Sequence, residues 1–322
     1  MTIKIGCSGF QEARSKYYEE FSLIEIQQTF FQPPPVGTAL KWRSQASPQF
    51  EFSVKAWQLI THEPVANGYR NLRERLPARA LANCGHFKPS KMVFEAWRKT
   101  EAVAEALQAK IIIFQTPKTF RPSPQNFRNF KNFFRRINRR KFTMVWEPGC
   151  KWPQDKINEL CHEFNLVYTS NPEYSPIISL GPIRYFRLRG KQGYRSRYND
   201  EDFQRYLRFE NNDKTSYFIL NNASMLFDAR NFVTYLQNHP VIEDPSTEVQ
   251  PVSDIQATTE NDSVECETCS RKDKKLIEVS SDEIADLTRE DHSAANGNGK
   301  KPLEVEPESD DSEAAVEEEA IK

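Results

Sequence analysis

The chain has 322 residues and a formal net charge of −1, and 38% of its residues are hydrophobic. No run approaches the ~18 consecutive apolar residues that a membrane-spanning helix needs. The first residues also lack the charged and apolar regions of a signal peptide. These features argue against a membrane partner, and we expect a cytoplasmic protein.

Eight short runs with the composition of β-strands alternate with helix-like segments. The strand-like runs cover residues 3–7, 23–27, 50–56, 110–115, 142–147, 165–169, 184–189 and 216–221. The helix-like segments cover residues 15–21, 36–45, 69–83, 90–108, 124–140, 153–164, 200–211 and 223–237. Such alternation is typical of a (β/α)8 barrel, so we predict an α/β fold of the TIM-barrel type over residues 1–242. Barrels of this type carry their chemistry at the carboxyl ends of the strands.

The charge distribution divides the chain near His239 and Pro240. Residues 1–242 have a net charge of +15 and hold all five tryptophans, whereas residues 243–322 have a net charge of −16 and no Trp, Phe or Tyr. A segment with high charge and few apolar residues cannot bury enough surface to offset the entropy of ordering. We therefore predict a disordered acidic tail over residues 243–322. Its apolar stretch Leu276–Val279 could add a strand to the sheet of a protein partner.

The seventh predicted strand places two cations on one face. Side chains alternate along a strand, so Arg187 and Arg189 point to the same side. A charge cannot enter the apolar layer between strands and helices without a large desolvation cost. Both arginines should therefore face the barrel interior near its mouth, where Glu25 and Glu147 could meet them. The cluster is then either an internal ion-pair network or a ligand site.

The loop that follows this strand, Arg189–Tyr198, contains four cations, two glycines and two tyrosines. The loops after strands seven and eight commonly bind phosphate in this fold, and glycine lets backbone N–H groups approach an anion. We expect Arg195 to bind the anion together with Arg187 and Arg189, and Tyr198 to stack on a ring. The alternative is a basic surface loop. Three amides at strand ends complete the predicted substrate-binding residues: Gln115, Asn221 and Asn222.

Four residues are candidates for catalysis. Glu25 and Glu147 could form an acid/base pair, as in glycoside hydrolases. Lys55 could serve as a nucleophile or a second anion clamp, and lowering its pKa would require burial. His62 follows the third strand, where a general base could lie, although a lone histidine is more often a hydrogen-bonded loop residue.

The sequence gives no support for a metal site, and it assigns no cofactor. The histidines of residues 1–242 are too few and too scattered for a zinc cluster: His62, His86, His162 and His239. The six cysteines have no regular spacing, so we expect reduced thiols. Cys266 and Cys269 form one CxxC pair, which is half of a zinc site; a zinc site bridging two chains or a redox pair are the alternatives.

The segment 127–141 is strongly basic. Its phenylalanines recur at helical spacing and should face the barrel, which leaves its cations on an outer face. The cations are Arg128, Lys131, Arg135, Arg136, Arg139, Arg140 and Lys141. A nucleic acid could bind such a face, and the acidic tail could compete for it. The alternative is a solvated basic surface with a solubilising tail.

Seven motifs in order carry a family resemblance. They are Ile5–Phe10, Glu25–Phe31, Phe52–Ala56 with Ile60–His62, Phe114–Pro117, Trp146–Pro148, Tyr185–Gly190 and Phe218–Asn222. On these motifs, residues 3–238 or so resemble the YecE-like family, the domain of unknown function 72. The resemblance implies a (β/α)8 barrel similar to the xylose-isomerase and endonuclease-like barrels, with no established reaction to transfer.

The chain departs from the family pattern at three places. Gln27-Gln28 stands where the family usually has Asn-Ser or Asn-Thr, and Phe31 stands where it has Tyr. Pro148-Gly149-Cys150 follows Glu147, where the family often shows an arginine within two residues. A longer amide and a lost cation would redirect a ligand in the mouth.

These observations leave three hypotheses for function. The first is a barrel that binds an anionic, phosphate-bearing ligand at its mouth, with a hydrolase reaction on a nucleic acid or a sugar phosphate. The second is a non-catalytic nucleic-acid-binding module regulated by its acidic tail. The third is a glycoside-type hydrolase that uses Glu25 and Glu147.

Overall fold

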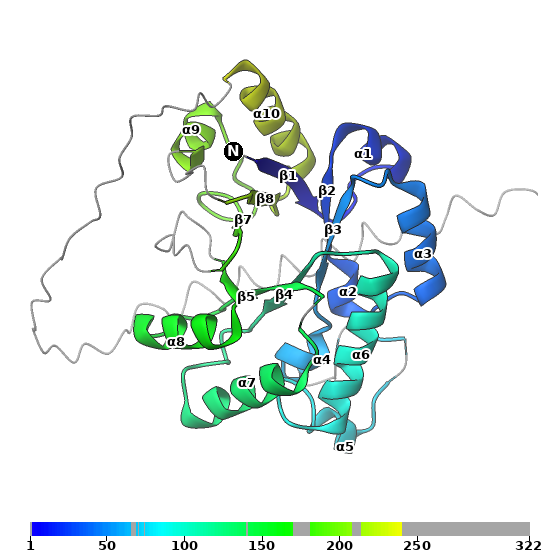
Figure 1. Ribbon diagram of the computed structural model, residues 1–322, viewed down its shortest axis with the longest axis vertical. Helices are drawn as coiled ribbons and strands as arrows, with labels where there is room; N and C mark the ends of the chain where they lie inside the picture. The colour runs from blue at the N-terminus through cyan, green and yellow to red at the C-terminus, as the bar shows by residue number, and fades with distance from the viewer. Residues whose placement is uncertain are drawn as a thin grey trace, which may run out of the picture. The chain divides into compact units, whose positions relative to one another are not determined.

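The computed structural model describes residues 2–65, 69, 71–73, 75–139, 141–169, 181–207 and 214–239. Eight strands form one sheet in the order β6-β5-β4-β3-β2-β1-β8-β7, and every pairing is parallel. The strands are β1 (Ile3–Ser8), β2 (Leu23–Ile26), β3 (Glu51–Lys55), β4 (Ile111–Gln115), β5 (Thr143–Glu147), β6 (Val167–Tyr168), β7 (Arg184–Leu188) and β8 (Ser216–Leu220). All eight predicted strands are confirmed, and they curl into a nearly closed barrel with helices around it (Figure 1).

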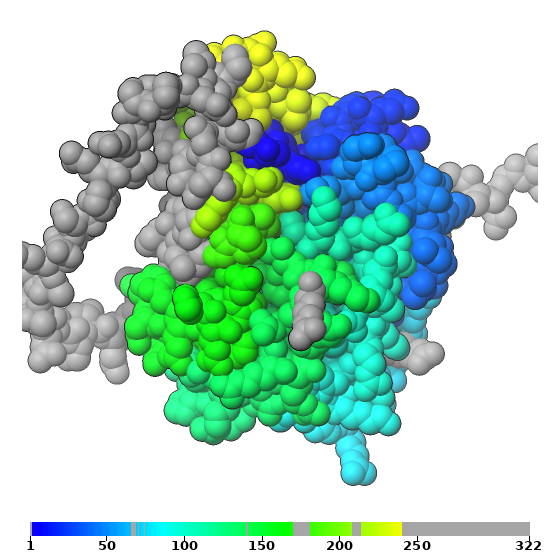
Figure 2. All heavy atoms as spheres, in the orientation of Figure 1, coloured from blue at the N-terminus to red at the C-terminus, as the bar shows by residue number. Residues whose placement is uncertain are grey.

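The barrel closes through β1, which pairs with both β2 and β8. It stays open between β6 and β7, where the described residues form no strand pairing. The Thr169 hydroxyl bridges this seam by donating a hydrogen bond to the Tyr185 carbonyl. A cluster of buried strand residues, among them Ile111, Ile113 and Ile219, fills the space between the strands, and the space-filling view shows a closed face (Figure 2). The barrel is therefore a packed core and not a pore.

The helices match most of the sequence-based expectations. They are α1 (Arg14–Glu20), α2 (Gln28–Phe31), α3 (Val36–Gln45), α4 (Gln58–Thr61), α5 (Ala78–Leu81), α6 (Lys91–Ala106), α7 (Pro124–Arg136), α8 (Gln154–Phe164), α9 (Asp200–Leu207) and α10 (Met225–Asn238). Among the described residues no helix is long and apolar enough to cross a membrane. The two single-turn helices α2 and α4 follow β2 and β3 directly and were not predicted.

The predicted helix over residues 69–83 is wrong for most of its length. Among its described residues only Ala78–Leu81 are helical. Pro77 lacks a backbone donor and disfavours helical geometry in the residue before it, which stops a helix from running through this point. Asn71 also has a left-handed backbone, with φ of 59°. Local backbone geometry at Asn71 and Pro77 therefore outweighed the helical preference that the sequence of residues 69–83 suggested.

Helix α7 packs its aromatic face onto the barrel, as predicted. Phe130 and Phe134 are fully buried, and their ring centroids lie 4.9 Å from Trp146 and 5.1 Å from Phe114, respectively. Burial of such rings is a major source of core stability. The packing fixes α7 against β4 and β5.

Several cations on the outer face of α7 and just beyond it are already paired. Lys131 lies 2.7 Å from carboxylate oxygens of both Glu159 and Glu163, and Arg135 lies 2.6 Å from Glu163. Lys141 lies 2.6 Å from Glu105. The segment is therefore less available to a polyanion than its sequence suggested. Arg140 and the predicted acidic tail lie outside the described residues.

A separate ionic cluster lies at the amino end of the barrel. Glu51 begins β3, and its carboxylate accepts bonds from Lys4 at 2.8 Å, Lys110 at 2.6 Å and the Tyr217 hydroxyl at 2.9 Å. Buried polar groups at this end of the fold serve stability. The carboxyl end holds a different cluster.

Candidate ligand-binding site at the barrel mouth

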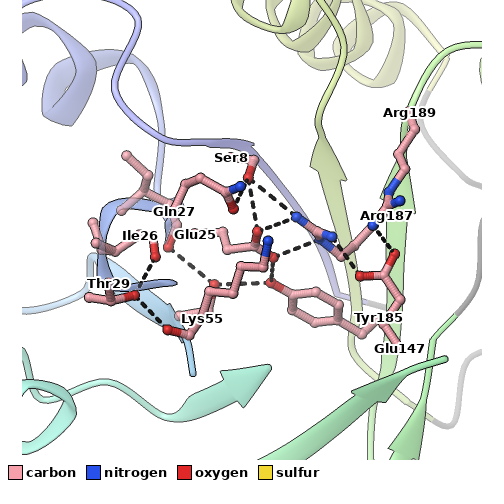
Figure 3. Close-up of polar contacts among 12 residues, drawn as sticks. Ser8, Glu25, Ile26, Gln27, Thr29, Lys55, Glu147, Tyr185, Arg187 and Arg189 are labelled. Carbon is pink, nitrogen blue, oxygen red and sulfur yellow. Dashed lines mark hydrogen bonds and ion pairs between the residues drawn. The ribbon is translucent and has the colours of Figure 1, made fainter. Parts of the chain in front are cut away.

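The carboxyl ends of five strands direct polar side chains into the barrel. Ser8, Glu25, Lys55, Glu147 and Arg187 come from β1, β2, β3, β5 and β7. The register places Glu25 opposite Ser8 on one side and Ser53 on the other. Side-chain alternation in parallel strands thus brings residues far apart in sequence to one layer of the barrel (Figure 3). We call these five residues, together with Tyr185 and Arg189, the mouth cluster.

Glu25 is fully engaged within the mouth cluster. The Nε and Nη2 atoms of Arg187 donate to its two oxygens at 3.0 and 2.7 Å, which is a bidentate pair. The Ser8 hydroxyl donates to one oxygen at 2.9 Å and the Tyr185 hydroxyl to the other at 3.0 Å. Both Glu25 and Arg187 are 0% exposed. These four bonds fix the position of a buried carboxylate.

Glu147 links Arg187 to the edge of the site. One of its oxygens accepts from Arg187 Nη1 and the other from Arg189 Nη2, both at 2.6 Å. Burial alone would raise the pKa of Glu147, but the charges of Arg187, Arg189 and Lys55 lower it. Burial alone would lower the pKa of Arg187, but the charges of Glu147 and Glu25 raise it. We predicted that both arginines meet both glutamates inside the barrel. This is confirmed for Arg187. Arg189 contacts Glu147.

Arg189 differs from Arg187 in its exposure. Its side chain is 39% exposed, whereas that of Arg187 is 0% exposed. Its Nε atom has no hydrogen-bond partner among the described residues. The unpartnered Nε is buried, so it is the outer part of the Arg189 side chain that is exposed, whereas every nitrogen of Arg187 is bonded within the mouth cluster.

Lys55 makes no ion pair with a carboxylate in the part of the chain that the structure describes. The structure records no hydrogen bond or ion pair for its Nζ among the described residues, and Nζ lies 4.0 Å from the centroid of the Phe30 ring. The residue is 3% exposed. Burial, and after it the charge of Arg187, lowers the pKa of Lys55 well below its ordinary value, although Glu25 and Glu147 oppose this shift. Figure 3 shows its side chain running alongside Glu25 toward the centre of the cluster.

His62 also packs against Phe30. The two rings meet edge to face with centroids 4.8 Å apart, and His62 Nδ1 lies 2.8 Å from the Thr61 hydroxyl. Burial lowers the pKa of His62 to about 3, and the charge of Lys55 acts in the same direction. The imidazole is therefore neutral at ordinary pH, which makes it a hydrogen-bonding group more than a proton acceptor.

Partly exposed polar side chains surround the buried layer. They are Gln27, His62, Gln115, Arg189 and Asn221. The Gln27 amide oxygen accepts a hydrogen bond from Ser8 at 3.3 Å, so this departure from the family pattern lies beside Glu25. Each residue follows or ends a strand, so a ligand at the mouth would meet amides, one imidazole and one guanidinium first.

The loop Arg189–Tyr198 is folded onto itself. The backbone N–H groups of Gly190, Gln192 and Ser196 donate to Tyr198 Oη, Ser196 Oγ and the Gly193 carbonyl at 2.5, 2.8 and 3.0 Å. Gly190 has φ of +87°, and a Cβ there would collide with the Gly193 carbonyl oxygen. The glycines thus serve the turn itself, and these three N–H groups are not directed at a ligand. Arg195 is exposed on this loop.

Tyr198 and Asn222 anchor the loop. Both are buried, and the Asn222 amide donates to the Ser196 carbonyl at 2.8 Å and to Asp228 at 2.7 Å. The Tyr198 backbone N–H also donates to Asp228, at 3.4 Å. These contacts bury both residues and tie the loop to α10.

Sequence reasoning missed Ser8, Tyr185 and Phe30. Tyr185 lies two residues before Arg187 on β7, so the same alternation that selected the arginines would have found it. Ser8 ends β1 and would have followed from the same rule. Phe30 lies on the unpredicted helix α2, and only the tertiary structure brings its ring to Lys55.

The fold and the cluster at its carboxyl end define a (β/α)8-barrel protein of the TIM type. The family model described as Protein of unknown function DUF72 matches residues 7–251, and the chain belongs to this family. Comparison with curated proteins gives no match.

Solved structures support the same fold. A DUF72 family protein from Enterococcus faecalis has a TM-score of 0.56 at 14% identity, over 74% of this chain and 97% of that chain. A DUF72 family protein from Thermotoga maritima has a TM-score of 0.55 at 17% identity, over 74% of this chain and 100% of that one. Endonuclease IV from Thermus thermophilus is more distant, with a TM-score of 0.42 at 10% identity over 73% of this chain and 99% of its own, and it carries no functional argument.

Proposed function

We propose that the barrel mouth binds a small anionic ligand that carries a phosphate or carboxylate group, and that Arg189 is its principal contact. The proposal rests on one observation, which is that Arg187 and Arg189 differ in exposure and in hydrogen bonding. Arg187 directs its donors to Glu25, Glu147 and Ser8, while Arg189 is partly exposed and keeps an Nε without a partner among the described residues. A partly exposed guanidinium that is bonded to one carboxylate can present its outer N–H groups in the geometry of an oxyanion.

The charges of the mouth cluster favour the same ligand. Two guanidiniums balance two carboxylates, so the ammonium of Lys55, when protonated, is the surplus charge. When protonated, Lys55 would serve as a second clamp for an anion near Arg189.

Hydrolysis of a nucleic acid or a sugar phosphate is the second candidate function. It is favoured by Glu147, whose lowered pKa keeps it ionised beside the partly exposed Arg189. Such a carboxylate could orient a water next to a bound phosphate.

Two other hypotheses have less support. A glycosidase acid needs a raised pKa, whereas Glu25 and Glu147 share one guanidinium and the pKa of Glu147 is lowered. A nucleic-acid module built on α7 would depend on cations such as Lys131, Arg135 and Lys141, which are paired with glutamates.

Calorimetric titration of the full chain with glycerol 3-phosphate and with a short dicarboxylate tests the proposal. Arg189→Ala should weaken binding at least about tenfold, because a charge-assisted bond is lost. Arg128→Ala is the matched control, since Arg128 is exposed on α7 and donates to Gln125 at the molecular surface. Equal affinity of both variants and the unaltered chain would overturn the assignment of Arg189.

A further inference from the structure

Lys55 is a buried amine that the mouth cluster leaves without a counter-ion among the described residues. Two carboxylates lie in the same layer, yet Arg187 and Arg189 occupy the oxygens of Glu147, and Arg187, Ser8 and Tyr185 occupy those of Glu25. A lysine kept for structure alone would be expected to pair with one of them. Lys55 instead rests on the Phe30 ring.

This environment suits a nucleophile. An amine attacks a carbonyl only when it is unprotonated, and burial beside a cation favours that form. The residue comes from the end of β3, where the strand's backbone is fixed by pairing with β2 and β4. The Thr29 hydroxyl lies 2.6 Å from the Lys55 carbonyl and holds α2, which carries Phe30, against the strand. Backbone and ring therefore position the amine.

We propose that Lys55 forms an imine with the carbonyl group of a small aldehyde or ketone that also carries a phosphate, such as an open-chain sugar phosphate. The inference rests on the anion site proposed above, because Arg189 would hold the phosphate while the carbonyl reaches Lys55. The charge of Arg189 acts on Lys55 and lowers the pKa of its amine. A phosphate without a carbonyl would bind there and not react.

The reaction balances without any further reagent. The amine lone pair attacks the carbonyl carbon, and the carbonyl oxygen takes a proton as the carbinolamine forms. Loss of this hydroxyl as water leaves a carbon–nitrogen double bond to Lys55. Amine and carbonyl compound thus give imine and water, with no oxidation or reduction.

Borohydride trapping on the full chain tests the imine. The protein is incubated with D-ribose 5-phosphate or D-glyceraldehyde 3-phosphate, reduced, and analysed by intact mass and peptide mapping. We expect one adduct per chain, located at Lys55 and competed by glycerol 3-phosphate, which has no carbonyl. D-Glyceraldehyde without phosphate should label Lys55 at least about tenfold less, because it lacks the charge-assisted contact with Arg189.

Two lysine variants control for nonspecific reaction. Lys55→Met should lose the single adduct, whereas Lys99→Met should keep it, since Lys99 is an exposed lysine that also lies on an aromatic ring, Trp57. Should Lys55→Met fail to fold, peptide mapping of the unaltered chain decides the matter. Adducts spread over exposed lysines, with none enriched at Lys55, would overturn the inference.

The experiment also separates the two proposals. Binding of glycerol 3-phosphate without trapping at Lys55 would overturn the imine and leave the anion site standing. Absence of both would overturn both. Trapping that Arg189→Ala does not reduce would overturn the role of Arg189 and retain the nucleophile.

Discussion

Arg187 divides its guanidinium between Glu25 and Glu147, with Nε and Nη2 bonded to the first and Nη1 to the second. One fully buried cation therefore joins strands β2, β5 and β7 across the barrel interior. Arg189, two residues further on, extends this chain to the surface through Glu147. Arg187, in the inner part of the cluster, is buried and fully bonded, and the partly exposed Arg189 side chain forms the edge of the cluster.

Replacing Arg187 should damage stability more than replacing Arg189. Arg187→Met leaves two buried carboxylates without their shared partner, and we expect a loss of about 3–5 kcal/mol in the free energy of unfolding. Arg189→Met removes a partly exposed pair and should cost about 1 kcal/mol or less. Urea denaturation of both variants measures this difference. Similar losses would contradict the division into a buried support and an exposed contact.

Lys55→Met should change how stability depends on pH. The folded-state pKa of Lys55 lies below its ordinary 10.5, so the unfolded chain binds more protons between these two values, and stability rises with pH across that range. Methionine removes this titration. We expect the variant to be more stable than the unaltered chain near neutral pH, with an advantage that shrinks toward pH 10.5. An advantage that is constant with pH would contradict a buried, unpaired amine.

His62 should contribute to loss of stability in acid. Its pKa is about 3 in the folded protein against 6.5 for an unperturbed histidine, so stability falls as pH drops from about 6.5 toward 3. His62→Gln should remove part of this slope, by about 1–3 kcal/mol in all, since the ring is partly exposed and solvent reduces the effect. His239→Gln is the control, because His239 is exposed at the end of α10. Identical acid titrations of the two variants would refute the assignment.

Two glycine substitutions should have opposite effects. Gly190→Ala drives a Cβ into the Gly193 carbonyl oxygen at φ of +87°, and we expect a cost of about 2 kcal/mol or more and a distorted loop. Gly37→Ala, within α3, meets nothing within 4 Å and should stabilise the fold by about 0.5–1 kcal/mol. Thermal unfolding distinguishes them. A neutral Gly190→Ala would mean that the loop after β7 is not held in this turn.

The strand pattern alone identified much of the mouth cluster. The alternation of side chains on β7, and the cost of a charge in the apolar layer beneath the helices, were enough to place Arg187 and Arg189 inside the barrel with Glu25 and Glu147. The same reasoning treated the two arginines as equivalent, and it expected Tyr198 and Asn222 to meet a ligand. Their burial behind the loop could not follow from residue type.

The sequence by itself determined the barrel, the order of its strands and the inward direction of the charged strand ends, because side-chain direction alternates with every residue and charges avoid the apolar layer. Only the tertiary structure decided which charges are satisfied and how deep each one lies. Arg187 is enclosed by two carboxylates, Arg189 reaches the surface, and Lys55 meets a phenyl ring. These differences depend on contacts among strands and helices that are distant in sequence. Such contacts determine how far water reaches each charged side chain and which partner that side chain bonds.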